Sequence, residues 1–198
     1  CSVDVRHWTF CTVVDRCENR IGRMWECPDF FPVGDPDRNT RVLVISPQDV
    51  TAEWPEFHNG NNALFLIGEY EKENHLFCRN RVQSADYGLD YYAPQTTQAP
   101  DGRRILIAWM KSWDTNIFPE GFSWNGMTTV PREVSIREED GRILQNPVRE
   151  LERYHGTPVC AEQVHVHEPV SFEGIRGRIA DLQVEIEGRG FGTFTISV

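Results

Sequence analysis

The sequence has no apolar run long enough to span a bilayer. Its longest runs, Val42 to Ile45 and Ile105 to Met110, are far shorter than the ~20 residues that a membrane helix needs. It also lacks basic residues relative to acidic ones, since 20 Lys and Arg stand against 30 Asp and Glu, for a net charge of −10. That balance disfavours nucleic acid and anionic membranes as partners. With 198 residues and 39% hydrophobic content, the chain can still fill one large globular domain or two small ones.

The six cysteines form no CxxC pair and no regular framework. A chain of this length does not need disulfides to fold, so we expect reduced thiols in a cytoplasmic protein. The chain opens at Cys1 without an initiator methionine and stops at Val198 inside an alternating run, which suggests that both ends are cut. The absence of a signal peptide is therefore uninformative.

Helical patterns are also scarce, and Pro147 to Tyr154 is the segment that could form a short helical turn. Instead, an aspartate-bearing turn followed by arginine and two aliphatic residues occurs three times, with the arginine at positions 41, 104 and 142. Two of these turns are Asp-Gly, the strongest short hairpin signal. Each is predicted to be a hairpin between a first and a second strand. Repeated hairpins favour propeller blades, although a sandwich or a barrel would satisfy the same pattern.

Further strands are predicted near both ends of the chain. A strand pair is expected from Val3 to Phe10 and from Cys11 to Val14. Beyond residue 160, three segments alternate apolar and polar residues as half-buried antiparallel strands do: Glu162 to Glu168, Ile179 to Glu187 and Gly192 to Val198.

One stretch, Trp25 to Phe31 (WECPDFF), sets a carboxylic acid among apolar side chains. Apolar surroundings make a carboxyl group costly to ionise and so raise its pKa, which suits a general acid. Pro28 predicts a strand near a sheet edge, or a loop, and argues against a helix. In an extended segment Glu26 and Asp29 point to opposite faces, so the two acids are expected to have different roles. The alternative is an ordinary strand-end carboxylate paired with an arginine.

WECPDFF resembles the acid/base segment of glycoside hydrolase family 32, which comprises invertases, fructan hydrolases and sucrose-6-phosphate hydrolases. The likeness continues at Ala85 to Gln95 (ADYGLDYYAPQ), at Arg104 to Met110 (RILIAWM) and from Trp124 to Leu151. All four stretches lie in the family's order and rough spacing. The resemblance implies an all-β fold. Residues 1–152 would form part of a five-bladed β-propeller, from the end of blade 2 through blades 3 to 5, and residues 153–198 would begin a β-sandwich.

The resemblance also implies a function. The parent enzyme would cleave terminal β-fructofuranosyl bonds of sucrose, sucrose 6-phosphate or fructans with retention and without a cofactor, and Glu26 would be the general acid/base. Retention needs a nucleophilic aspartate about 5–5.5 Å away. In the family this aspartate lies in an Asn-Asp-Pro-Asn segment, and a second one, in Arg-Asp-Pro, binds fructose. Neither motif occurs here, and Asp35 in its turn is not a substitute, so the chain alone is expected to be inactive.

The substrate, a small β-fructoside, is expected to meet three further side chains. By resemblance, Asp86 and Asp90 border the innermost strand of the fourth blade and bind sugar hydroxyls, and Trp124 lines the pocket from the fifth blade. A structural role is the alternative for Asp86, since its carboxylate can bond backbone amides in the turn before Gly88. For Asp90 the two roles are equally supported.

Other chemistries are weighed and set aside. Cys27 has no histidine or basic neighbour to activate it, so it is predicted to be a small packing residue. His165 and His167 would share one face of a predicted strand, as metal ligands can, but no third ligand is evident and no metal is predicted. A non-catalytic carbohydrate-binding or structural propeller is the rival function. The sequence does not indicate the oligomeric state.

Overall fold

The computed structural model describes residues 1–113, 120–177, 179–188 and 193–197. The chain divides into two compact units, Cys1–Val148 and Arg149–Val198. Each unit is described by itself. The predicted assignment of residues 1–152 and 153–198 to a propeller and a sandwich stays a prediction.

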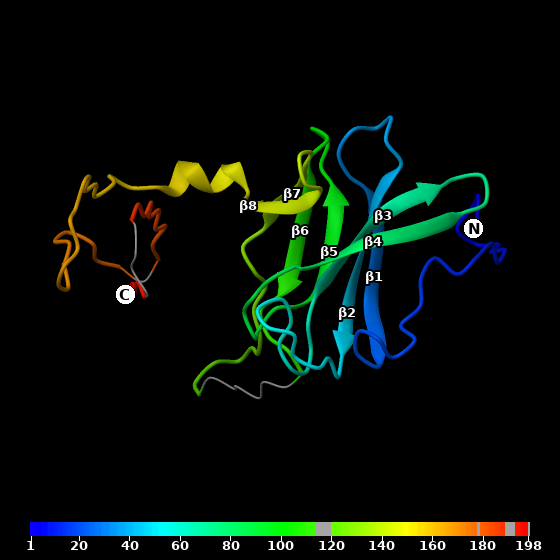
Figure 1. Cartoon of the computed structure of the whole chain (residues 1–198), viewed down its shortest axis with the longest axis horizontal. Helices are drawn as coiled ribbons and strands as arrows, with labels where there is room; N and C mark the ends of the chain where they lie inside the picture. The colour runs from blue at the N-terminus through cyan, green and yellow to red at the C-terminus, as the bar shows by residue number, and fades with distance from the viewer. Residues whose placement is uncertain (114–119, 178, 189–192, 198) are drawn as a thin grey trace. The chain divides into compact units, whose positions relative to one another are not determined.

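The first unit consists of two four-stranded antiparallel sheets (Figure 1). The first sheet contains β1 (Met24–Pro32), β2 (Thr40–Gln48), β3 (Leu64–Glu71) and β4 (Leu76–Ser84). The second contains β5 (Tyr92–Gln98), β6 (Arg104–Trp109), β7 (Arg132–Arg137) and β8 (Arg142–Pro147). In both sheets the spatial order follows the chain order, which is the up-and-down topology of a propeller blade. The predicted all-β class is thus confirmed, whereas the count of five blades stays a prediction.

The three predicted hairpins are present, but one has a different place. The turns before Arg41 and Arg104 join the first strand of a sheet to its second, as expected. The turn before Arg142 instead joins β7 to β8, the third and fourth strands of the second sheet. Gly102 and Gly141 take φ angles of 89° and 68° in the two Asp-Gly turns, which such turns require. Both Asp-Gly hairpins therefore belong to a single sheet. The chain leaves β6 through a long connection and returns as β7, which pairs with β6 in the same sheet.

The main core lies between the two sheets. It unites one face of the first sheet with β6, β7 and β8 through a single cluster of buried side chains: Phe31, Val33, Val42, Val44, Ala63, Phe65, Ile67, Ala85, Tyr91, Leu106, Ala108, Val134 and Ile143. The opposite face of the first sheet has its own cluster, Leu43, Ile45, Leu64, Leu66 and Phe77. Strand β2 contributes to both clusters because its apolar residues run without alternation, as in a strand covered on both faces.

The N-terminal segment does not form the predicted strand pair. Residues 1–23 contain no strand. The carboxylate of Asp4 accepts hydrogen bonds from the backbone N–H groups of Arg6 (2.9 Å) and His7 (2.8 Å). These local bonds stabilise a turn and so compete with strand pairing. Further on, Val14 and Ile21 pack against the second cluster of the first sheet.

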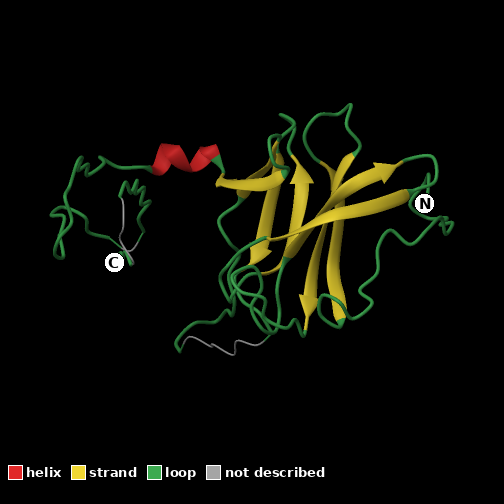
Figure 2. Cartoon of the chain, viewed as in Figure 1, coloured by secondary structure: helices red, strands yellow, loops and turns green. Residues whose placement is uncertain are grey.

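The second unit begins with a short 3-10 helix, Arg149–Tyr154, as the sequence allowed (Figure 2). The strands predicted at Glu162 to Glu168 and Ile179 to Glu187 are wrong, because these residues have no strand partner and Val166 and Ile186 are exposed. Alternation produces a strand only where a neighbouring strand and an apolar face are available. The segment from Gly192 to Val198 lies partly outside the described residues. Within the described ranges, no helix is both long and apolar enough to cross a membrane.

Candidate active site

A β-bulge in β1 determines where its two acids point. Glu26 pairs with Ser46 and Asp29 pairs with Val44, so three steps along β1 match two steps along β2. Cys27 takes a φ of 48° inside this bulge. Because the bulge adds one residue, it returns Asp29 to the same face as Glu26. The prediction that the two acids point to opposite faces is therefore wrong.

Strand β5 carries a matching irregularity between Tyr92 and Gln95, where Ala93 takes a φ of 51°. Side chains and backbone of β5 bond directly to β1. The Gln95 Nε2 donates to the Cys27 carbonyl (2.9 Å), and the Thr96 N–H donates to Asp29 Oδ2 (2.8 Å). The first strands of the two sheets are thus joined, and Asp29 connects them.

The Glu26 carboxylate is held through one of its two oxygens. Glu26 Oε2 accepts hydrogen bonds from Gln48 Nε2 and from the Tyr92 hydroxyl, both at 2.8 Å. Tyr92 is only 1% exposed, and its hydroxyl also lies 3.2 Å from the Ser46 carbonyl oxygen. Within the described part of the chain, no side chain or backbone group bonds the other oxygen, Oε1. The carboxyl group is therefore fixed in orientation while one oxygen stays available to a ligand.

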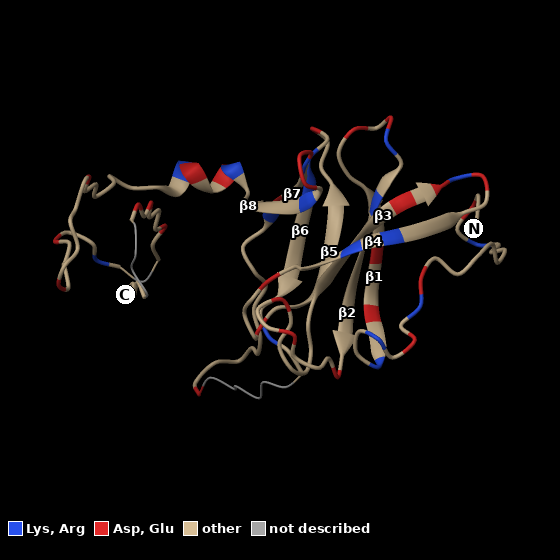
Figure 3. Cartoon of the chain, viewed as in Figure 1, with Lys and Arg blue, Asp and Glu red and all other residues tan. Residues whose placement is uncertain are grey.

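The partners of Glu26 are neutral. Strand β5 has no charged residue, whereas β1 carries acidic ones (Figure 3). The alternative of a strand-end carboxylate paired with an arginine is therefore not observed among the described residues. The predicted apolar frame is present only in part. Trp25 and Phe30 pack against the cluster on the other face of the sheet, whereas Phe31 belongs to the main core on the face of Glu26. Neighbours along a strand alternate in direction, so adjacent strands, not adjacent residues, build the surroundings of this carboxyl.

Burial raises the pKa of Tyr92 well above its ordinary value, and the adjacent Glu26 carboxylate acts in the same direction, although the Gln48 hydrogen bond opposes them. The hydroxyl consequently stays protonated at neutral pH and can only donate to Glu26. Burial likewise raises the pKa of the neighbouring Tyr91.

These shifts predict a loss of stability at alkaline pH. The folded state holds the Tyr92 proton more tightly than the unfolded state, so this stabilisation is complete below about pH 10 and is lost as the pH rises further. The free energy of unfolding should fall by up to about 1.4 kcal/mol per pH unit for each such tyrosine. Denaturant titrations of the complete protein between pH 8 and 12 measure it. Tyr92→Phe should reduce the slope, and Tyr154→Phe, at an exposed position, should not; equal slopes in wild type and Tyr92→Phe would contradict the assignment.

The long connections lie at the end of the sheets that carries Glu26. Among the described residues they comprise 49–63, 85–91, 110–113 and 120–131, whereas short turns at 33–39, 72–75, 99–103 and 138–141 occupy the opposite end (Figure 1). The long connections expose several aromatic side chains, Trp54, Tyr87, Trp113, Phe122 and Trp124. Loops set on a rigid scaffold commonly carry binding residues, and exposed aromatic faces suit the C–H groups of a sugar ring.

The model of the glycosyl hydrolases family 32 N-terminal domain matches residues 1–147, which include both sheets and the Glu26 segment. The chain belongs to this family. It is 38% identical over 157 residues to raffinose invertase of Escherichia coli, covering 73% of this chain and 32% of that protein. It is 36% identical over 148 residues to sucrose-6-phosphate hydrolase of Escherichia coli, covering 75% and 30%. The family-32 chain therefore spans about a third of the length of these relatives.

Solved structures of family members share its fold. A β-fructofuranosidase of Bombyx mori superposes with a TM-score of 0.70 at 32% sequence identity, covering 80% of this chain and 33% of that one. A mutant of the Bombyx mori enzyme in complex with sucrose superposes equally well. Sucrose-6-phosphate hydrolase of Lactobacillus gasseri gives a TM-score of 0.65 at 25% identity, covering 77% and 30%.

In the family-32 chain, Asp86 is engaged on both oxygens. Its Oδ2 lies 2.8 Å from Arg132 Nη2, and its Oδ1 accepts the Gly88 N–H at 2.8 Å. The hydrogen bond from the Gly88 N–H is the structural role that the sequence offered as an alternative to sugar binding. The ion pair with Arg132 was not predicted. Arg132 also lies over the Tyr91 ring, 4.9 Å from its centre. Asp86 is thus oriented firmly at the start of the 85–91 connection.

Asp90 and Tyr91, at the far end of the same connection, are less satisfied. Asp90 Oδ1 and the Tyr91 hydroxyl are buried and have no hydrogen-bond partner among the described residues. Buried polar atoms without partners are uncommon and costly, so each needs an explanation such as a ligand or a water molecule. This observation favours a functional role for Asp90.

Trp124 lies in the 110–131 connection and is 49% exposed. Its ring meets Phe122 edge to face at 5.0 Å. The residues that follow pair with the end of β6, where Met110 N–H donates to Met127 O (2.7 Å) and Thr129 N–H donates to Ala108 O (2.9 Å). Trp124 therefore lies between β6 and β7 of the second sheet. Asp86 precedes β5 of this same sheet, so the two residues do not belong to two different sheets.

Two partners of Glu26, Gln48 and Tyr92, were not among the predicted site residues. Tyr92 lies inside a stretch that resembles the family, which is a signal that could have found it. Gln48 ends a buried strand before a polar connection, and nothing in its neighbours marks it. Its role depends on the antiparallel pairing of β1 and β2, which brings residue 48 opposite residue 24.

Cys27 is exposed and is therefore not the packing residue that was predicted. Partial burial, and then the charge of Glu26, raise the pKa of its thiol, which disfavours a thiolate nucleophile. His165 and His167 are exposed and lie outside any strand, so the shared strand face proposed for them is absent.

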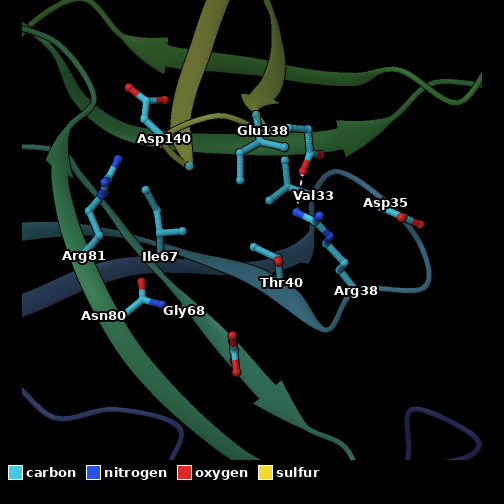
Figure 4. Close-up of a pocket in the computed structure, with 13 residues that line it drawn as sticks. Val33, Asp35, Arg38, Thr40, Ile67, Gly68, Asn80, Arg81, Glu138 and Asp140 are labelled. Carbon is cyan, nitrogen blue, oxygen red and sulfur yellow. Dashed lines mark hydrogen bonds and ion pairs between the residues drawn. The ribbon is translucent and has the colours of Figure 1, made fainter.

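A cavity at the opposite end of the first unit does not belong to this site. It is lined by the turn residues Asp35, Arg38, Glu138 and Asp140 and by β3 and β4 (Figure 4). Arg38 and Glu138 form an ion pair of 2.7 Å across it. Because these turns lie at the far end of the strands from Glu26, the cavity cannot position a substrate on that carboxyl.

Proposed function

We propose that the complete protein is a β-fructofuranosidase that cleaves the terminal β-fructofuranosyl bond of sucrose, sucrose 6-phosphate or a fructan with retention of configuration. The observation that carries the proposal is the Glu26 carboxyl, fixed through Oε2 by Tyr92 and Gln48 and open at Oε1. Membership of the family and the named activities of its relatives support the same substrate class.

In this proposal Glu26 is the general acid/base. Its Oε1 donates a proton to the leaving glycosidic oxygen and later takes one from the attacking water. Tyr92 and Gln48 hold Oε2, so the proton is presented on the oxygen that faces the substrate. The second carboxylate, which attacks the anomeric carbon, is the aspartate of the family's Asn-Asp-Pro-Asn motif on a five-bladed propeller, and this motif does not occur in the chain.

The substrate would be held by the connections at the same end. Asp86, oriented by Arg132, accepts fructose hydroxyl groups, and the unpartnered Asp90 Oδ1 accepts another. Trp124 offers an exposed aromatic face to the ring. These roles rest on the orientation, burial and exposure of the three side chains.

Transfer to methanol tests the stereochemistry of the reaction. The complete protein, given sucrose in water containing methanol, should release methyl β-fructofuranoside, because a covalent intermediate is attacked from the face that glucose left. The products are identified by NMR. Glu26→Gln protein at the same concentration is the control and should form neither fructose nor the methyl glycoside at a comparable rate. Formation of the methyl α-anomer would contradict a retaining mechanism.

A further inference from the structure

Three metal-binding side chains meet at a place far from Glu26. Cys1, Cys11 and His75 each bring one ligand atom to within 4.8 Å of the others. His75 belongs to the short turn 72–75 between β3 and β4, at the end of the first sheet opposite the long connections. Figure 1 shows the N-terminus beside this hairpin. The cluster could not be predicted from a CxxC or similar spacing, because its members are distant in sequence.

The chain brings the two cysteines together by local bonds. The Thr9 N–H donates to the Cys1 carbonyl at 2.8 Å, which closes the first nine residues into a loop and places Cys1 near Cys11. A second contact fixes this segment to the sheet. Asp15 and Arg79 form an ion pair of 3.0 Å in which both side chains are mostly buried. Arg79 lies on β4, so the pair holds the segment along the β3–β4 hairpin where His75 lies.

His75 is both constrained and oriented. It takes a φ of 54°, a left-handed conformation that is uncommon for residues other than glycine. Its Nδ1 lies 2.7 Å from the Tyr70 hydroxyl. Metal-binding histidines usually engage one ring nitrogen in such a bond, which leaves the other nitrogen for the metal. The backbone and the tyrosine together determine how the imidazole is presented.

We propose that Cys1, Cys11 and His75 bind one thiophilic divalent cation of the zinc type. Two thiolates and an imidazole are ligands that zinc prefers, and a water molecule would complete a tetrahedron. In such a site the ligand atoms are about 3.5–3.8 Å apart, so side-chain rotations of about 1 Å would close the cluster around the ion. Binding releases the two thiol protons to solvent. The bound ion would fasten the N-terminal segment, whose Val14 and Ile21 cover the first sheet, to the hairpin.

Cobalt(II) binding tests the site without reference to catalysis. The reduced chain, titrated with Co²⁺ alone, should develop thiolate-to-cobalt charge transfer and the d–d bands of tetrahedral coordination, saturating at one ion per chain. Zinc should displace the cobalt and bleach the spectrum. Cys11→Ser and His75→Ala should each weaken binding at least about 100-fold, and Tyr70→Phe should weaken it about 10- to 100-fold, as outer-shell changes do.

The controls separate this site from adventitious thiol binding. Cys78→Ser, on nearby β4, and Cys160→Ser, in the second unit, remove exposed thiols outside the cluster and should leave the spectrum and the affinity unchanged. A spectrum that survives His75→Ala, or that disappears in Cys160→Ser, would overturn the proposal. So would the absence of any cobalt spectrum, or a mass two hydrogens lower that shows Cys1 and Cys11 joined as a disulfide under the assay's reducing conditions.

Discussion

Glu26→Gln in the complete protein is expected to lower kcat for sucrose by about 10²- to 10⁴-fold, the range that general acid catalysis contributes. The amide is nearly the same size and can still accept a hydrogen bond from Tyr92. It cannot donate an acidic proton to the leaving oxygen. Initial rates with sucrose and with an activated fructoside measure the effect, and the activated substrate should lose much less rate because its leaving group needs little protonation.

A matched control is available on the same sheet. Glu69→Gln changes an exposed carboxylate on β3, near the opposite end from Glu26, and should leave both rates unchanged. Equal losses for natural and activated substrates in Glu26→Gln would contradict the acid role. Such a result would assign Glu26 to positioning of the bound sugar.

The second large effect is expected at Asp86. Asp86→Ala in the complete protein should weaken fructose binding by about 5- to 150-fold, because a bound sugar hydroxyl would lose its acceptor, at about 1–3 kcal/mol. Trp124→Ala should weaken binding by roughly 2- to 12-fold, the range for loss of an aromatic contact. Isothermal titration calorimetry with fructose measures both dissociation constants.

The ion pair of Asp86 with Arg132 makes a control for stability necessary. Asp140→Ala breaks another arginine–aspartate pair, Arg137 with Asp140 at 2.6 Å, which is more exposed and lies at the end of the sheets that lacks the long connections. It should change the unfolding midpoint without changing the dissociation constant for fructose. If Asp86→Ala behaves in the same way, with reduced stability and unchanged fructose affinity, then its carboxylate is a structural group.

Much of the fold follows from local chemistry. All three aspartate-bearing turns form hairpins. In two of them glycine follows aspartate and tolerates the positive φ that a tight turn needs. Which sheet each hairpin enters depends on the connections between them. Thr128, in the connection from β6 to β7, pairs with Trp109 at the end of β6, and β7 itself pairs with β6. Arg142 therefore follows the last turn of the second sheet and does not belong to a third sheet.

Elsewhere the local pattern was a poor guide. The alternation in Glu162 to Glu168 and Ile179 to Glu187 predicted strands, yet these segments have no strand to pair with. The N-terminal segment is apolar enough for a strand, but Asp4 stabilises a turn there with its own side chain. A strand needs partners that its own residues do not supply, whereas a turn can be specified within four residues.

The sequence by itself determined that the chain is all-β and, through the WECPDFF segment, that it resembles glycoside hydrolase family 32. It also made Glu26 the leading candidate for the proton donor. Only the tertiary structure decided the surroundings of Glu26. A one-residue bulge turned Asp29 onto the same face, and the pairing of strands brought Gln48 and Tyr92 to one carboxylate oxygen. The same is true of Cys1, Cys11 and His75, which no spacing connects. Composition and motifs report on neighbours along the chain, whereas a site is made by residues that pairing and packing bring together across it.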